Sequence, residues 1–463
     1  MLELDRTQPV ALRTQLEIQL RDAIRSGRLT GGERLPSSRA LAAELNLSRG
    51  LVQDCYAQLQ AEGYLTSHHG SATRVSETVA TTRQAEVAPP AAPVRQRLVA
   101  DFASGVPDLG LMPRTDWAWA VREACRTAPS SAFDYGDPNG DAHVRGLVAA
   151  YLRRVRAVDA TAGQVIVCGG FAQGLALVLR ALAESGRDLV AVEDPGSIGT
   201  VTTAALGAGG SAVAVPVDEH GIDVAALHAS KARVVVVSPA HQWPTGVVLA
   251  AARRHELLSW ARDRDAIIIE DEYDAEFRYD REAVGSLQGL APDRVVVLGT
   301  VSKSLAPALR LGWAVVPAEL VERVTAAKRT ADRGTPVLDQ LALGILMESG
   351  RYDRHLRRMR SEYAARRDVL VTAFGTHAPQ VSITGLAAGF HAVAHLPDGV
   401  AEAAVIEGAR RRRVGLYGMS TMRSTHDPEP GQLVLGFGNT SRQEIAAGVE
   451  AIADLFTISR RAR

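Results

Sequence analysis

Hydrophobic positions in the first 76 residues follow a pattern that predicts three short helices and a hairpin. In residues 11–28, apolar side chains recur at helical spacing and form one face. Ser37 or Ser38 caps a second helix, and Ser48 caps a third helix over residues 48–63. Residues 64–75 form two short strands. Three helices followed by a hairpin are typical of a winged helix-turn-helix.

From residue 101, short β-branched runs alternate with helical stretches. This alternation predicts a mostly parallel sheet with helices on both faces, in which ligands lie beyond the carboxyl ends of the strands. The runs are residues 165–167, 189–192, 234–238, 267–270, 295–298 and 313–316.

Residues 77–100 separate these two parts and lack both periodicities. They contain Pro89, Pro90 and Pro93, which is typical of a linker. We therefore expect a first domain over residues 1–76, a linker over residues 77–100 and a second domain over residues 101–463.

The composition excludes several classes of protein. Of the 463 residues, 46% are hydrophobic and 22% are charged, and 52 basic residues balance 52 acidic ones, as in an ordinary folded protein. Cys55, Cys125 and Cys168 form neither a disulfide framework nor a metal motif, so we expect reduced thiols in a cytoplasm and no metal. No apolar run approaches the ~20 residues of a membrane span, and the first residues lack a signal core. We expect neither membrane association nor export.

Lysine occurs only at Lys231, Lys303 and Lys328, while the other 49 basic residues are arginines. Any chemistry that needs a lysine amine must therefore use one of three positions. Lys231 precedes a predicted strand, at the edge opposite the ligand side, and Lys328 lies in a polar helix. We expect both of these on the solvated surface, and only Lys303 directly follows a predicted strand.

Four successive strand ends carry groups that together suit pyridoxal 5'-phosphate. The turn Gly169–Gly170 leads into an apolar helix, whose free N–H groups suit a phosphate. A proline loop over residues 239–246, carboxylates with a tyrosine at residues 271–274, and Lys303 follow the other strands. The cofactor needs a lysine amine for its aldehyde, a carboxylate for its pyridine nitrogen, and hydroxyls with an arginine for its phosphate. Near Lys303, the sequence offers Thr300, Ser302 and Arg310.

The first part resembles the DNA-binding domain of the GntR superfamily, on the motif at residues 25–65. The resemblance implies that double-stranded operator DNA is a partner, with side chains at the start of the third helix reaching base edges. It implies phosphate contact by Arg39, base contacts near Ser48, Arg49, Gly50 and Leu51, and a wing tip at His69 and Gly70. Leu51 and Gln53 replace residues common in relatives, so the operator sequence does not transfer.

The charge of this first part favours a different interpretation. Residues 1–76 hold nine arginines against eight acidic residues, a smaller surplus than strong non-specific DNA binding requires. The alternative is a helical bundle that binds another protein. If DNA is the partner, arginines must gather on one face or a dimer must supply the affinity.

The second part resembles fold-type I aminotransferases on five motifs. Together with a GntR-like head, these motifs resemble the MocR family of transcriptional regulators. The resemblance implies an α/β fold: a winged helix-turn-helix, then a PLP-dependent transferase domain of fold type I with a small C-terminal α+β subdomain, in a homodimer. The motifs occupy residues 135–158, 169–182, 238–246, 270–280 and 299–313.

The resemblance also implies roles for individual residues. Lys303 is the Schiff-base lysine, Asp271 lies on the pyridine nitrogen and Tyr273 on the ring hydroxyl. Trp243 replaces the usual asparagine, which leaves His241 or Gln242 to reach the cofactor. Around the phosphate, the resemblance places Gly170, Phe171, Ala172, Thr300, Ser302 and Arg310, with Tyr135 supplied by the second subunit.

The sequence departs from the family where a substrate carboxylate would bind. Residues 197–199 read Ser-Ile-Gly, without the tyrosine or the arginine that relatives use there. Residues 431–440 also lack the arginine that aminotransferases carry. Arg423 is one arginine that could replace it.

Three hypotheses about function follow. The first is a regulator that senses pyridoxal phosphate, an amino acid or an amine through an imine at Lys303 and alters operator binding. The second is a working aminotransferase with a regulatory head, although the missing clamp counts against efficient turnover. The third is a DNA-binding protein with a purely structural cofactor. Loss of the clamp favours pyridoxal phosphate itself as the effector.

Overall fold

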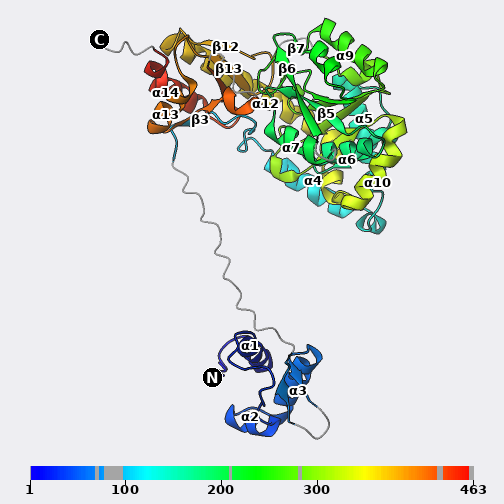
Figure 1. Cartoon of the computed structure of the whole chain (residues 1–463), viewed down its shortest axis with the longest axis vertical. Helices are drawn as coiled ribbons and strands as arrows, with labels where there is room; N and C mark the ends of the chain where they lie inside the picture. The colour runs from blue at the N-terminus through cyan, green and yellow to red at the C-terminus, as the bar shows by residue number, and fades with distance from the viewer. Residues whose placement is uncertain are drawn as a thin grey trace. The chain divides into compact units, whose positions relative to one another are not determined.

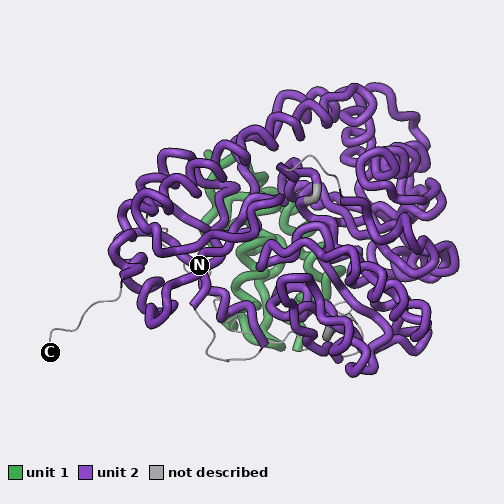
Figure 2. The backbone as a smooth tube through the Cα atoms, turned by 90° about the horizontal axis from the view of Figure 1, so that it is seen from above, with its two compact units in different colours: residues 1–95 green, residues 96–463 purple. Residues whose placement is uncertain are grey.

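The computed structural model describes residues 2–67, 72–77, 97–207, 211–279, 284–424 and 431–457. The chain divides into two compact units, residues 1–95 and residues 96–463, shown in green and purple in Figure 2. Within the described ranges, no helix is long and apolar enough to cross a membrane. All three cysteines are free thiols.

The smaller unit is the winged helix-turn-helix that the sequence predicts. Ser37 caps the second helix by accepting a hydrogen bond from the Ala40 N–H, and Ser48 caps the third by accepting one from the Leu51 N–H. Apolar faces of all three helices meet in one core. The elements are α1 (Leu12–Arg25), α2 (Ser38–Glu44), α3 (Arg49–Ala61), and the antiparallel strands β1 (Leu65–Thr66) and β2 (Arg74–Val75).

The larger unit contains an eight-stranded sheet in the order β4-β11-β10-β9-β8-β5-β6-β7. Figure 1 labels β5, β6 and β7 of this sheet, with helices around them. Neighbouring strands are parallel from β10 through β6, whereas β11 is antiparallel to both of its neighbours. The mostly parallel sheet expected from the sequence is thus confirmed. The strands are β4 (Val165–Cys168), β5 (Leu189–Asp194), β6 (Ser211–Asp218), β7 (Gly221–Ile222), β8 (Val234–Val237), β9 (Ile267–Glu272), β10 (Val295–Thr300) and β11 (Gly312–Val315).

Helices cover both faces of this sheet. In β9, Ile267 and Ile269 point into the core beneath α6 and α10, while Ile268 points into the core beneath α8 and α9. Central strands buried on both faces therefore read as continuous apolar runs. The helices of this layer are α4 (Arg114–Thr127), α5 (Ala142–Arg156), α6 (Phe171–Ala183), α7 (Ile198–Gly207), α8 (Val224–Ala229), α9 (Ala251–Asp263), α10 (Val321–Ala331) and α11 (Val337–Glu348).

A smaller α+β subdomain completes the larger unit, packed on the long helix α12 (Arg351–His377). Its four-stranded sheet has the order β12-β13-β16-β15 and is antiparallel throughout. The remaining elements are β12 (Ser382–Thr384), β13 (His391–His395), α13 (Glu402–Arg411), β14 (Val414–Gly415), β15 (Tyr417–Gly418), β16 (Gln432–Gly436) and α14 (Arg442–Ile452).

The beginning of the larger unit lies earlier than the sequence indicates. The short strand β3 (Ala100–Asp101) pairs in parallel with β14, and the Val99 N–H donates to the Arg413 carbonyl at 2.7 Å. Residues 99 and 100, assigned to the linker by composition, therefore belong to the subdomain. Residues 78–96 of the expected linker lie outside the described residues.

The structure overturns the expectation for Lys328. Lys231 is exposed ahead of β8, as expected, but the Lys328 side chain on α10 has 0% exposure. The polar sequence around Lys328 concealed this burial, because neighbouring residues of α10 face solvent while Lys328 shares a face with Val324 and Ala327.

Candidate functional site

The end of β9 and the loop that follows β10 bring a carboxylate and a lysine together in a buried setting. Lys303 lies just beyond β10, and its Nζ donates to the Gly105 carbonyl. Burial lowers the pKa of the Lys303 amine, while the nearby charges of Asp271 and Asp274 act in the opposite direction. A lowered pKa increases the fraction of neutral amine, which is the form that attacks an aldehyde.

Asp271, near the end of β9, has an acceptor that the protein itself does not satisfy. Its Oδ1 is buried and has no hydrogen-bond partner among the described residues. Burial raises the pKa of the Asp271 carboxyl well above its ordinary value, and the Lys303 charge opposes this shift. A protonated pyridine nitrogen would supply the missing donor and a compensating charge, so this residue fits pyridoxal phosphate.

The turn after β4 forms a cradle suited to a phosphate. Gly170 has a φ of +91°, and a Cβ there would lie 3.4 Å from both Arg310 Nη2 and Thr300 Oγ1. The helix α6 starts at Phe171, so the N–H groups of its first turn lack helical acceptors and face an anion site. These groups fit the phosphate of the cofactor.

Hydrogen bonds hold the sides of this cradle in place. Thr300 Oγ1 donates to Ser302 Oγ at 2.8 Å, and the Ser302 N–H donates back to Thr300 Oγ1 at 3.1 Å. Arg310 Nη2 donates to the Gly169 carbonyl at 2.6 Å while its side chain stays exposed. The hydroxyls and the arginine expected near Lys303 therefore lie beside Gly170.

The loop after β8 engages its polar side chains within the protein. Tyr273 Oη donates to the His241 carbonyl at 2.9 Å. Gln242 Nε2 donates to the Pro195 carbonyl at 2.9 Å, and Gln242 Oε1 accepts from the Thr245 hydroxyl at 2.6 Å. Gln242 therefore braces two loops, and the structure gives it a role that the sequence does not indicate.

Behind Tyr273, sequence reasoning missed a buried group of three polar side chains. His241 Nδ1 lies 2.8 Å from Asp274 Oδ2, and the His241 and His391 rings are in contact, tilted by 41° with 4.6 Å between their centroids. Burial and the neighbouring His241 lower the pKa of His391 well below its ordinary value. Potential ligand atoms of the three lie within 4.8 Å of one another, yet the direct bond between His241 and Asp274 satisfies that pair without an ion.

Glu193, at the end of β5, lies between two cavities near Asp271. A cavity of about 30 Å³ is lined by Glu193, Trp243 and Asp271, and a larger one of about 350 Å³ extends past Glu193 to Ile198 and Arg423. Burial raises the pKa of the Glu193 carboxyl to about 8. Nothing in the sequence around Glu193 distinguishes it, since only the fold places it there.

No arginine is arranged as a substrate clamp among the described residues of the larger cavity. Arg423 lines this cavity, but its Nη2 donates to Gln432 Oε1 at 3.1 Å. Ile198 is 63% exposed on α7. The expectation from residues 197–199, that the clamp arginine of relatives is missing, stays a prediction, because residues 425–430 beside Arg423 lie outside the described residues.

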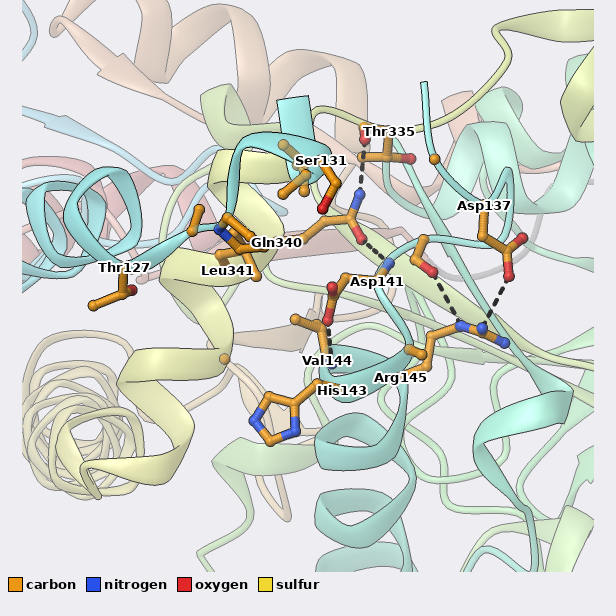
Figure 3. A pocket seen from close by; sticks show the side chains of 18 of the residues that line it. Thr127, Ser131, Asp137, Asp141, His143, Val144, Arg145, Thr335, Gln340 and Leu341 are labelled. Atoms are coloured by element: carbon orange, nitrogen blue, oxygen red, sulfur yellow. Dashed lines mark hydrogen bonds and ion pairs between the residues drawn. The ribbon is translucent and has the colours of Figure 1, made fainter. Parts of the chain in front are cut away.

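Tyr135 lines a cavity of about 490 Å³, part of whose wall is drawn in Figure 3. Its side chain is 75% exposed, and the Arg333 guanidinium lies 5.4 Å from its ring centroid. Figure 3 shows Gln340 in the wall of this cavity, bridging the Thr335 carbonyl and the Asp141 N–H.

In the smaller unit, the residues expected at DNA lie on the surface. Arg39 on α2 is exposed, as are Ser48, Arg49 and Gly50 at the start of α3. Leu51 is half-buried against the core of the helices, so it contributes packing as well. His69 and Gly70 lie outside the described residues.

Comparison with known families covers most of the chain. Residues 98–452 match the family "Aminotransferase class I and II", and residues 12–75 match "Bacterial regulatory proteins, gntR family". The chain is 31% identical over 475 residues to the probable rhizopine catabolism regulatory protein MocR of Rhizobium meliloti, covering 98% of this chain and 96% of that protein.

Two further relatives concern the cofactor. The chain is 32% identical over 396 residues to the pyridoxine biosynthesis transcriptional regulator PdxR of Corynebacterium glutamicum, covering 83% of each protein. It superimposes with a TM-score of 0.67 and 25% identity on the α-aminoadipate aminotransferase LysN of Thermus thermophilus, covering 78% of this chain and 92% of that one. That enzyme was solved with N-(5'-phosphopyridoxyl)-L-leucine.

Proposed function

The chain belongs to the class I and II aminotransferase family with a gntR-family regulatory domain, as in the MocR-type regulators, and we propose that its larger unit senses a small molecule. At this coarser level it is a transcriptional regulator that binds pyridoxal phosphate and DNA. In the proposal, reaction of a ligand at Lys303 changes how a homodimer holds operator DNA. Such coupling requires the two liganded states to differ in affinity for DNA.

One observation carries the proposal: the residues that fit the cofactor are present, whereas a clamp for a substrate carboxylate is not found among the described residues. The cofactor, when bound, supplies an aldehyde that reacts reversibly with amines. Burial lowers the pKa of the Lys303 amine, which raises the fraction of its neutral form. Asp271 offers a buried acceptor without a partner, and the turn at Gly170 offers N–H groups to the phosphate.

Among the candidate effectors, pyridoxal phosphate itself best suits the walls of the larger cavity. A ligand that lacks an α-carboxylate needs no clamp arginine, and Arg423 is already bonded to Gln432. The name of the C. glutamicum relative, which refers to pyridoxine biosynthesis, supports the same choice.

Two expectations about assembly complete the proposal. Tyr135 is 75% exposed, which suits a side chain that completes the phosphate site of a second subunit. Arg39, Ser48, Arg49 and Gly50 present exposed groups that suit contact with DNA, while the roles of His69 and Gly70 stay predictions from the sequence.

The deciding experiment measures DNA binding by the full-length protein. Operator sequences are first selected from a random duplex library, and affinity is then titrated without cofactor and with pyridoxal phosphate from well below to well above its dissociation constant. We expect operator affinity to change at least about fivefold, as is usual for allosteric coupling. For Lys303→Ala, operator affinity should stay at the value of the cofactor-free wild type at every concentration of pyridoxal phosphate. A flat response in the wild type would reject sensing.

A working aminotransferase is the second candidate, favoured by the buried pair of Lys303 and Asp271. It is tested by mixing the cofactor-loaded protein with a panel of amino acids and following the aminated cofactor by absorbance. Rapid conversion with any one amino acid would favour the enzyme, whereas conversion over hours favours the sensor.

A further inference from the structure

Lys328 is completely buried, and its position is explained by a hydrogen-bonded chain that leads to the phosphate cradle. Its Nζ donates to Asp332 Oδ1 at 2.9 Å, to Asp332 Oδ2 at 2.7 Å and to Thr335 Oγ1 at 3.0 Å. Lysines are almost never fully buried unless they are paired, because removing the ammonium from water costs several kcal/mol. All three ammonium protons therefore have acceptors.

Asp332 connects this ammonium to the first turn of α6. Gln173 Nε2 donates to Asp332 Oδ2 at 2.7 Å, and Gln173 Oε1 accepts from the Gly169 N–H at 2.6 Å. Because the amide oxygen of Gln173 is held by Gly169, its nitrogen must find an acceptor on the opposite side. Asp332 is that acceptor, and Lys328 compensates its charge.

Gly169 is thereby held from both sides of its peptide. Gln173 accepts from its N–H, and Arg310 donates to its carbonyl at 2.6 Å. The next residue, Gly170, has a φ of +91° and begins the set of N–H groups that face the phosphate. A small rotation at Gly169 would turn these N–H groups away from a bound anion.

The far end of the chain is anchored to the sheet. Thr335 Oγ1 donates to the Val167 carbonyl at 3.1 Å, in the strand that leads into the cradle. Gln340 Nε2 donates to the Thr335 carbonyl at 2.7 Å, as Figure 3 shows. The turn over residues 332–335 is therefore fixed to β4 as well as to α6.

We propose that Lys328 is a positioning residue for the phosphate group of the cofactor, acting through Asp332 and Gln173 on the turn Gly169–Gly170. The group it serves is a phosphate monoester, and the inference rests on the proposed binding of pyridoxal phosphate at Lys303. Lys328 itself makes no contact with the cofactor in this role.

The test compares two aldehydes that differ only in the phosphate. Cofactor-free full-length protein is titrated with pyridoxal phosphate and with pyridoxal, and binding is followed by the absorbance of the bound form. We expect Lys328→Met to weaken pyridoxal phosphate about tenfold, as loss of a positioning hydrogen bond implies, and to change pyridoxal less than about twofold. Lys231→Met, at an exposed lysine, is the matched control and should change neither.

A second variant covers the case in which Lys328→Met does not fold. Gln173→Leu removes the link at a half-buried position on α6 and should produce the same selective loss. Asp332→Asn keeps an acceptor for Gln173 and should lose less than Gln173→Leu. Equal losses for both aldehydes, or no loss in either variant, would overturn the proposal. A wild type that binds neither aldehyde would instead reject the cofactor assignment at Lys303.

Discussion

We call the turn around Gly170 the cofactor end of the site and the cavity beside Ile198 its mouth. The two differ in how far the protein alone holds their polar side chains in place. At the cofactor end, Thr300, Ser302 and Arg310 are held by short hydrogen bonds around Gly170. At the mouth, the described residues that line the cavity beside Ile198 are of mixed polarity and include one arginine, Arg423, which is already bonded to Gln432.

This difference separates holding a cofactor from turning over a substrate. Binding at a preorganised site loses little to reorganisation, so the cofactor end suits tight binding. Efficient transfer also needs a substrate held in a reactive position, and the arginine found among the described residues of the larger cavity, Arg423, is bonded to Gln432. The contrast therefore predicts large effects for changes at the cofactor end and small effects at the mouth.

The largest expected effect is at Arg310. Arg310→Met removes a charge-assisted bond to the phosphate and should weaken pyridoxal phosphate by about 30- to 100-fold, with pyridoxal nearly unchanged. Titration of cofactor-free protein with both aldehydes measures it. Arg329→Met, at an exposed arginine of α10, is the control. A loss below about threefold would show that the cradle is not the phosphate site.

Replacing Asp271 should have a smaller effect. It should stabilise the cofactor-free protein and weaken binding of the cofactor. Asp271→Asn removes a buried carboxylate whose Oδ1 has no partner, so the cofactor-free protein should melt at a higher temperature. The same change should weaken pyridoxal phosphate about tenfold, because the charge opposite the pyridine nitrogen is lost. Thermal unfolding with and without cofactor measures both. If the cofactor raises the melting temperature of wild type and variant equally, Asp271 does not serve the ring.

Glu193 lies between the cofactor end and the mouth. We expect it to affect the stability of the protein in a way that depends on pH. The pKa of its carboxyl is about 8 in the folded chain against 4.5 ordinarily, so between these values the folded chain retains a proton that the unfolded chain releases. Stability from this group therefore falls as pH rises from about 4.5 to about 8.

Glu193→Gln removes this dependence. We expect its free energy of unfolding to exceed that of the wild type by roughly 4 to 5 kcal/mol at pH 9, at about 1.4 kcal/mol for each pKa unit, and to match it at pH 4. Denaturant unfolding at the two pH values measures the difference. The exposed Glu219→Gln serves as the control. An equal gain at both pH values would contradict a buried, protonated carboxyl.

The smallest effect is expected at the mouth. Arg423→Gln should change the rate of conversion by amino acids less than about threefold, because its guanidinium is engaged with Gln432. A loss of about 100-fold for one amino acid would identify Arg423 as a clamp and would remove the contrast between the two ends.

Periodicity along the chain was sufficient for the fold class and for most strands of the eight-stranded sheet. Runs such as residues 267–270 are apolar at nearly every position because the strand is buried on both faces, and this pattern is distinctive. The strand β6 escaped prediction, since Ser211–Asp218 is mostly not buried and contains Pro216. The antiparallel direction of β11 also has no local signal, because direction depends on how the chain returns to the sheet.

The candidate site was predictable where its groups lie in one motif. Thr300, Ser302 and Lys303 are close in sequence, so their grouping could be foreseen. His391 reaches His241 only through packing of β13 against the loop after β8, although the two histidines are far apart in the sequence. Lys328 was misjudged because helical neighbours of a buried residue can all be polar.

The three lysines occupy three distinct environments, which has a practical consequence for chemical labelling. Lys328 is completely buried, Lys303 is partly buried just beyond β10, and Lys231 is exposed to solvent. An amine-reactive reagent in modest excess should therefore modify Lys231 first among the lysines. A dye attached to Lys231 would lie at the edge of the sheet opposite the site. The amine of Lys303 would stay unmodified and available for study.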